Sequence, residues 1–147
     1  MDIRSLKQDA YNSLVKDRPQ ILEKNRGYGI ISFTLGDLTY AIPLRSNLNH
    51  SNGFKTISTK QGDRIVWNGL DYSKALIVNQ EDIESTSFVL RSQKEFDKIQ
   101  VHKEKIKTDF EKYVLSYIEC VGKGTSTTDN RFKFCTLQYF HSELGLL

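Results

Sequence analysis

The chain is poor in the residues that cross-link or brace small proteins, with two cysteines, two prolines and three histidines among its 147 residues. Cys120 and Cys135 form no CxxC pair, and the histidines are too widely spaced for a zinc motif such as HExxH. Neither a disulfide framework nor a metal site is therefore expected, and no cofactor is predicted.

Long apolar runs are also missing. The longest, such as residues 75–78, span only a few positions, far short of the roughly 20 that a membrane-spanning helix needs. The first residues contain no apolar stretch of the kind found in secretory leaders. These absences predict a cytoplasmic protein with two reduced thiols. The content of hydrophobic residues, 38%, predicts one folded domain over residues 1–147.

Acidic residues are absent from residues 38–62, although Arg45, Lys55 and Lys60 lie in this segment. A basic, amide-rich segment without carboxylates suits a polyanionic partner, because nothing in it repels phosphate. The alternative interpretation is a solvated connection of no functional meaning. The net charge of +3 does not separate the two.

Strands are predicted in the first half of the chain. Residues 28–35 and 38–44 are rich in β-branched and aromatic side chains and flank the turn pair Gly36-Asp37, which predicts a hairpin. Pro43 has no N–H, so we expect the second strand to end close to it. Further strands are expected at residues 64–67 and 74–78, separated by a turn at Asn68-Gly69, with short ones at residues 2–6 and 87–90.

Helices are predicted at residues 8–15 and, as one long helix, at residues 92–121. Apolar side chains in the long segment recur at helical spacing: Phe96, Ile99, Ile106, Phe110, Tyr113 and Tyr117. Lys103 interrupts this stripe. One explanation is that its aliphatic stem packs on the core while the amine reaches solvent, and the alternative is that the amine approaches a bound phosphate. Residues 132–144 are expected to close the chain as a strand or short helix. The order of elements predicts an α+β fold with an antiparallel sheet.

Polar and basic side chains flank both outer ends of the predicted hairpin. Arg26 precedes its first strand, and Arg45, Ser46, Asn47 and His50 follow its second. The two segments meet at one end of an antiparallel sheet, so these side chains are expected to share a rim. Such a set can bind a phosphodiester while a ribose 2′-hydroxyl attacks the phosphorus, which requires no metal. Taken singly, each residue is as well explained as a surface charge or a turn residue.

The stretches "RGYGIISF", "YAIPLRSNLNHSNGF", "GLDYSKALIV" and "FEKYVLSYIE" occur in this order. In order and spacing they resemble the toxins of type III toxin–antitoxin systems, most closely the TenpN branch of the ToxN/CptN/AbiQ family. The resemblance implies a compact, strongly bent antiparallel sheet of the Kid/MazF type, flanked by helices. It also implies a metal-independent endoribonuclease that leaves 2′,3′-cyclic phosphate and 5′-hydroxyl ends. The partner implied is an RNA antitoxin, a short pseudoknot from a tandem-repeat transcript in a cyclic complex with the toxin, and the role implied is phage defence by abortive infection.

The family's motif residues fall on Arg26 and Ser46, which the resemblance makes the central catalytic pair, with Arg45 and Asn47 as supports. ToxN-like members have a lysine two residues after the serine, where this chain has Leu48. His50 or Lys55 is expected to substitute, and the ordinary pKa of histidine, about 6.5, suits His50 for proton transfer. A guanidinium is a poor base, so Arg26 is expected to stabilise charge.

Further candidates for RNA contact are Asn47, Asn49, Lys55 and Lys74. A second group is expected to grip the antitoxin RNA, and about half of its members are expected to be simply solvated: Lys103, Lys107, Lys123, Arg131 and Lys133. For Asp71 and Lys74 an ion pair that braces a strand is an equally good interpretation. A non-catalytic RNA-binding module and a sheet-based protein-interaction domain remain alternatives for the chain as a whole.

Overall fold

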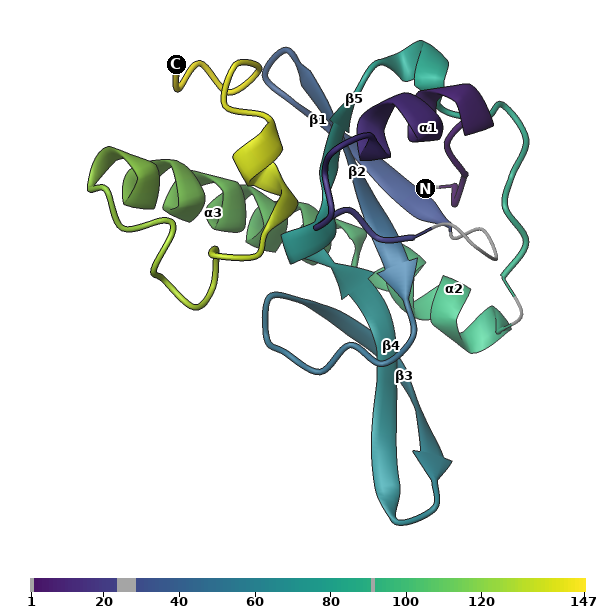
Figure 1. Ribbon diagram of the computed structural model, residues 1–147. Helices are drawn as coiled ribbons and strands as arrows, with labels where there is room; N and C mark the ends of the chain where they lie inside the picture. The colour runs from purple at the N-terminus through teal and green to yellow at the C-terminus, as the bar shows by residue number, and fades with distance from the viewer. Residues whose placement is uncertain (1, 24–28, 91) are drawn as a thin grey trace.

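The computed structural model describes residues 2–23, 29–90 and 92–147. Within these residues the chain forms an α+β fold, in which a strongly curled antiparallel sheet lies against helices (Figure 1). This confirms the predicted class and the bent sheet. The elements in chain order are α1 (Gln8–Val15), β1 (Ile30–Leu35), β2 (Leu38–Arg45), β3 (Gly53–Gln61), β4 (Arg64–Asp71), the 3-10 helix η1 (Tyr72–Lys74), β5 (Leu76–Val78), the 3-10 helix η2 (Gln80–Asp82), α2 (Gln93–Val101), α3 (Lys103–Gly122) and the 3-10 helix η3 (Thr136–Tyr139).

The hairpin of β1 and β2 is confirmed, with Leu35 paired to Leu38 across the predicted two-residue turn. Gly36 has a φ of +61°, a conformation that glycine adopts without steric cost. Ile30, Ile31 and Ile42 in these strands are fully buried. The hairpin is therefore both the clearest local signal in the sequence and the centre of the core.

Strand β2 changes its partner along its length, and Pro43 lies where the change occurs. Thr39 to Ala41 pair with β5, whereas Leu44 and Arg45 pair with β4. The N–H of Leu44 points to the β1 side, where it donates to the carbonyl of Gly29 at 2.8 Å. Because successive N–H groups of a strand point to opposite edges, the nitrogen of Pro43 faces the gap between β5 and β4. The proline thus costs no hydrogen bond of the sheet.

Strand β3 was not predicted, and the turn predicted at Asn68-Gly69 is wrong. Both residues continue β4, which pairs with β3 to form a two-stranded arm that extends from the body of the molecule (Figure 1). Gly69 is needed for close approach: a Cβ there would lie 2.2 Å from the carbonyl oxygen of Phe54. A glycine in a strand therefore marks contact between two backbones here.

We expect Gly69→Ala to lower the free energy of unfolding by about 2 kcal/mol or more, because the new methyl group would overlap a backbone atom that cannot move aside. Gly122→Ala is the matched control, since an added Cβ at the end of α3 meets nothing within 4 Å. Its stability should be unchanged or slightly higher. Urea denaturation of both variants checks this, and equal stabilities would show that the arm adjusts at Gly69.

The single long helix predicted for residues 92–121 is wrong, because the chain breaks at His102 into α2 and α3. The ring of His102 lies 5.5 Å from that of Phe54, so the break is covered by β3. It allows α2 to pack on β3 while α3 packs elsewhere, with Phe110 against the rings of Tyr40 and Tyr72 at 5.3 and 5.6 Å. The only mark of the break in the apolar stripe is Lys103, the first residue of α3, because apolar side chains at helical spacing continue on both sides of it.

The ends of the chain complete the core. Residues 2–6 form isolated bridges, Arg4 with Ile30 and Leu6 with Ile83, instead of the expected strand. Residues 87–90 form no strand either. The C-terminal segment includes η3, in line with the expected short helix, and the Thr136 hydroxyl donates to the carbonyl of Ala75. No helix in the described ranges is long and apolar enough to cross a bilayer.

Candidate functional site

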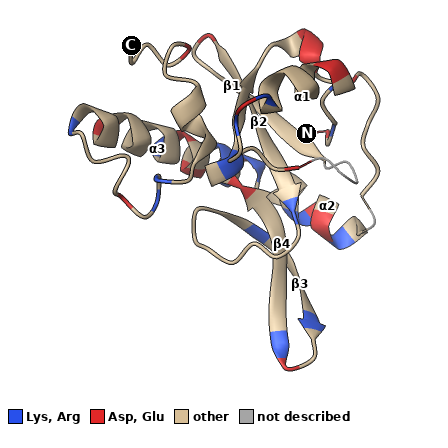
Figure 2. Ribbon diagram, in the orientation of Figure 1, with Lys and Arg blue, Asp and Glu red and all other residues tan. Residues whose placement is uncertain are grey.

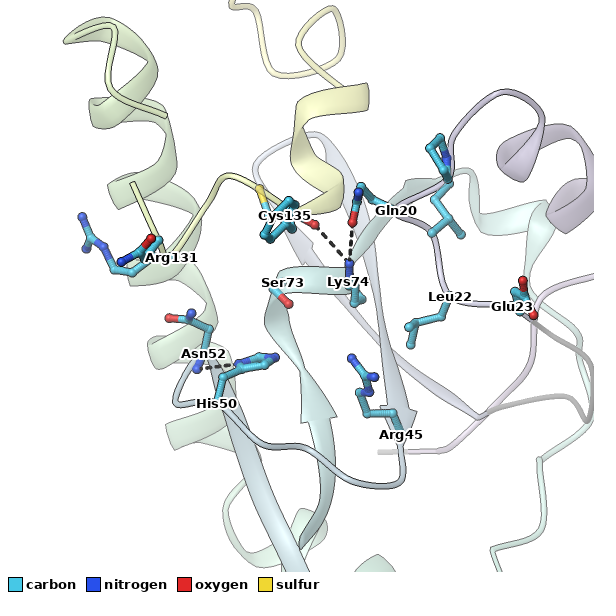
Figure 3. A pocket seen from close by; sticks show the side chains of 14 residues that line it. Gln20, Leu22, Glu23, Arg45, His50, Asn52, Ser73, Lys74, Arg131 and Cys135 are labelled. Atoms are coloured by element: carbon cyan, nitrogen blue, oxygen red, sulfur yellow. Dashed lines mark hydrogen bonds between the residues drawn. The ribbon is translucent and has the colours of Figure 1, made fainter. Parts of the chain in front are cut away.

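A pocket of about 530 Å³ lies where the end of β2, the loop between β2 and β3, and η1 meet the segments before β1 and after α3 (Figure 3). Four basic side chains line it: Arg45, His50, Lys74 and Arg131. Lys and Arg residues also lie at the end of β2 and along the β3–β4 arm (Figure 2). Glu23 also lines the pocket, so the lining combines these four basic side chains with one carboxylate, all from segments far apart in the sequence.

The basic side chains are organised by a carboxylate, Asp71, which is 0% exposed. Its Oδ2 accepts hydrogen bonds from Arg45 Nη1 at 2.9 Å and from His50 Nε2 at 3.3 Å. Its Oδ1 accepts the backbone N–H of Ser73 at 3.0 Å and the Ser73 hydroxyl at 2.5 Å. Asp71 ends β4 and caps η1, and the register Arg45↔Gly69 between β2 and β4 brings Arg45 beside it. The carboxylate therefore fixes the positions of Arg45 and His50.

Burial alone would raise the pKa of Asp71, but hydrogen bonds from His50, Ser73 and Arg45 lower it, and the net effect is a pKa below the ordinary value. The carboxylate is thus ionised at neutral pH. An ionised carboxylate accepts hydrogen bonds and cannot donate one, so Arg45 and His50 both point N–H groups at it.

The tautomer of His50 follows from its partners. The backbone N–H of Asn52 donates to His50 Nδ1 at 3.1 Å, so this nitrogen carries no proton (Figure 3). The proton is on Nε2, which donates to Asp71. A carboxylate on one ring nitrogen orients the imidazole and holds its tautomer, as in catalytic His–Asp pairs. Nδ1 is the basic atom of this pair, and its present partner is a single backbone N–H.

Lys74 is the most distinctive cation of the pocket. Its Nζ donates to Gln20 Oε1 at 3.3 Å and to the carbonyl of Phe134 at 3.0 Å (Figure 3). Among the residues that the structure describes, no carboxylate forms an ion pair with it. Burial lowers its pKa, and the charge of Asp71, which acts in the opposite direction, only partly offsets this effect. The predicted ion pair between Asp71 and Lys74 is therefore wrong, since Asp71 pairs with Arg45 and His50.

The loop after β2 exposes the other residues that were expected in the site. Ser46, Asn47 and Asn49 are exposed and none of them lines the pocket. Asn47 has a φ of +58°, and this turn directs Leu48 inward, where it is 2% exposed and its Cδ2 approaches Gly69. Leu48 is thus an apolar anchor of the loop, and it does not have the role expected of a lysine at this position. It holds the loop against the β3–β4 arm.

The remaining predicted RNA contacts are scattered. Lys55 lies over the ring of Trp67 on the arm, at 6.0 Å, and Lys123 pairs with Glu119 at 2.8 Å on α3. Lys103 is exposed and Lys107 half-buried on the first turns of α3, away from the pocket lining. Exposure of Lys103 argues against a stem packed on the core. Arg26 lies outside the described residues.

Arg131 and Lys133 lie near the pocket. Arg131 lines it and pairs with Asp129 at 2.9 Å, while the ammonium of Lys133 is 5.2 Å from the ring centroid of Phe134, a lining residue. Arg45, His50, Lys74 and Arg131 are thus the predicted residues that the structure brings together.

Several residues of the site escaped prediction: Gln20, Asn52, Ser73, Asn130, Phe134 and Cys135. The sequence carries no signal for most of them, because they lie in loops that only the fold brings together. Burial raises the pKa of the Cys135 thiol, which makes it a poor nucleophile. No cluster of three metal-binding side chains occurs among the described residues.

Comparisons of the chain with protein-family models, curated proteins and solved structures gave no match. The interpretation of the site therefore depends on its own chemistry. A concave surface with several cations, one of them without a carboxylate partner, is suited to an anion that carries phosphate.

Proposed function

We propose that the pocket binds an RNA phosphodiester and that the chain is a metal-independent endoribonuclease, the toxin of a type III toxin–antitoxin system. The observation that carries the proposal is Lys74. Its partly buried amine is positioned by two oxygen acceptors, without a carboxylate partner among the described residues, beside Arg45. An ammonium has three donors, so two acceptors leave one N–H for a phosphate oxygen. The resemblance of the sequence to TenpN-type toxins supplies the reaction.

In the proposed reaction the ribose 2′-hydroxyl attacks the adjacent phosphorus, and the 5′-oxygen of the next nucleotide leaves, taking a proton from solvent water to become a hydroxyl. His50 Nδ1 accepts the proton of the 2′-hydroxyl after exchanging its bond to the N–H of Asn52, while Asp71 holds the opposite side of the ring. Lys74 and Arg45 stabilise the charge that develops on the phosphate oxygens. The products are a 2′,3′-cyclic phosphate and a 5′-hydroxyl.

The proposed regulation is inhibition by a processed RNA pseudoknot that occupies the same basic surface in a cyclic complex. Lys55, Lys60 and Arg64 on the β3–β4 arm extend the positive charge away from the pocket and are available to such an RNA. The toxin released during phage infection would then cleave cellular RNA and arrest growth of the host.

A second candidate function is RNA binding without cleavage. It is favoured by two observations: both ring nitrogens of His50 already have partners, and Ser46 does not line the pocket. In this case the same cations bind phosphate, but no group in the pocket takes the proton of the 2′-hydroxyl.

Purified protein incubated with single-stranded RNA in excess EDTA tests the proposal. We expect cleavage with 2′,3′-cyclic phosphate ends, identified by mass spectrometry, and growth arrest of host cells that express the protein alone. Binding of intact RNA without any cleavage would support the second candidate. Neither binding nor cleavage would contradict both.

The roles of His50 and Ser46 are separable by substitution. We expect His50→Gln to slow cleavage by about 100-fold or more, as for loss of a general base, and Ser46→Ala to have a smaller effect because Ser46 lies outside the pocket lining. Single-turnover cleavage rates measure both, and thermal melting confirms that each variant is folded. The opposite ranking would assign catalysis to Ser46, as the resemblance implies.

A further inference from the structure

Phe134 is an aromatic residue that folding leaves exposed. Among the described residues, Phe134 is the one aromatic residue in the set of exposed large hydrophobic side chains, with 59% of its surface exposed. Its neighbours Phe132 and Cys135 are each 1% exposed. The N–H of Cys135 donates to the carbonyl of Phe132 at 3.0 Å, which closes a turn around Phe134. The ring is therefore presented to solvent from a backbone that is anchored on both sides.

The exposed ring belongs to the basic pocket. Phe134 lines it, and its own carbonyl oxygen accepts the hydrogen bond from Lys74 Nζ at 3.0 Å. The ammonium of Lys133 lies 5.2 Å from the ring centroid. The same residue thus presents an aromatic surface and positions a cation, and a second cation lies beside the ring. A nucleotide has the matching pair of groups, a flat base and a phosphate, separated by one sugar.

We propose that Phe134 is the stacking platform for one nucleobase of the bound RNA, with the adjoining phosphate at Lys74 and Arg45. This inference rests on the proposed RNA-binding function and defines its substrate as unpaired RNA. Pockets that take small ligands typically enclose roughly 300–1,000 Å³, and the volume here, about 530 Å³, accommodates one splayed nucleotide. A base within a duplex is stacked on both faces and cannot reach the ring.

Stacking on an aromatic ring does not read the edges of a base, because every base has a π-face. Phe134 is therefore expected to select single-stranded over double-stranded RNA without imposing a sequence. Cation–aromatic contact with Lys133 leaves the opposite face of the ring for the base, since a base needs only one of the two faces.

The test compares Phe134→Ala, Phe134→Trp and, as a control, Leu115→Ala, which removes a side chain of similar exposure, 58%, from α3. The probe is a fluorescent single-stranded oligoribonucleotide with 2′-O-methyl groups, which cannot be cleaved by 2′-hydroxyl attack. A second probe of equal length has the same sugar–phosphate chain without bases. Fluorescence anisotropy gives the dissociation constants, and circular dichroism confirms folding.

We expect Phe134→Ala to weaken binding of the base-bearing probe by about 5- to 150-fold, the range that corresponds to loss of one base–aromatic stack. Phe134→Trp should retain affinity, Leu115→Ala should match the original protein, and the base-free probe should not distinguish Phe134→Ala from the original. If Phe134→Ala binds the base-bearing probe as the original protein does, the stacking role is wrong while RNA binding stands. If the original protein binds no RNA, the proposed function fails with it.

Discussion

Replacing Asp71 by asparagine should destabilise the protein by about 3 kcal/mol or more and remove most of its proposed ribonuclease activity. The amide is nearly the same size, but it loses the charge that Arg45 and His50 share. Its NH2 group would also face N–H donors, since the described partners of Asp71 all donate to it. Urea denaturation and single-turnover cleavage measure the two effects.

The matched control is Asp109→Asn, in which the lost partner is Lys105 at the surface of α3. An exposed pair one helical turn apart contributes only about 0.3–0.5 kcal/mol, so this variant should remain close to the original in stability and in activity. Equal effects of the two substitutions would mean that Asp71 is not the organising group of the pocket.

Asp71 should also make the protein sensitive to acid. Its pKa in the folded state is lower than in the unfolded chain, where it is about 3.9, so its stabilising contribution is fully present above that pH. The contribution is lost as the pH falls through the lower, folded-state pKa, because the unfolded chain then binds more protons. The Asp71→Asn variant should lose less stability over this acidic range than the original protein does, which a series of denaturation curves would show.

Replacing Lys74 by methionine should slow RNA cleavage by about 100- to 1,000-fold, as expected for removal of one group that stabilises the transition state. The fold should not suffer, because burial already lowers the pKa of this amine and methionine fills similar space without the cost of desolvating a charge. This one variant would then lose activity while keeping its stability. Loss of a residue with a purely structural role would lower both.

Lys105→Met is the control for this change, because Lys105 carries the same charge on α3 and pairs with Asp109. We expect its cleavage rate to remain near that of the original protein. A further variant, Lys74→Arg, retains a charge at all accessible pH values and should keep RNA binding at alkaline pH. The original protein should lose binding as the pH rises through the lowered pKa of Lys74. Full cleavage by Lys74→Met would contradict the assignment of this amine to the phosphate.

The predictable parts of the structure are those that local patterns control. The hairpin with its Gly36-Asp37 turn, the helix at Gln8–Val15 and the overall α+β class all follow from periodicity and turn chemistry. The predictions fail where a residue typical of turns occurs for a different structural reason. Gly69 indicates a turn by composition, but in the fold it permits the backbones of β3 and β4 to approach.

The candidate site shows the same division. The sequence singled out Arg45 and His50 because they lie in a polar stretch after a predicted strand. It singled out Lys74 because that residue lies in GLDYSKALIV, one of the stretches that carry the resemblance. It did not connect them, because the connection runs through Asp71 in β4, which is separated from β2 in the sequence by the whole of β3. Phe134 approaches Lys74 from the far end of the chain through a single hydrogen bond.

Residue order alone therefore determined that the acid-free segment, residues 38–62, begins in a predicted strand and continues beyond it, and that the chain forms an antiparallel sheet with helices. Only the tertiary structure decided which of the polar side chains face a common pocket. The physical reason lies in Leu48 and Asp71: one buries its apolar side chain and leaves Ser46 and Asn47 exposed, and the other is a buried charge that draws Arg45 and His50 together. Leu48 meets Gly69, and Asp71 meets Arg45 and His50, so both effects depend on contacts between residues that are far apart in the sequence.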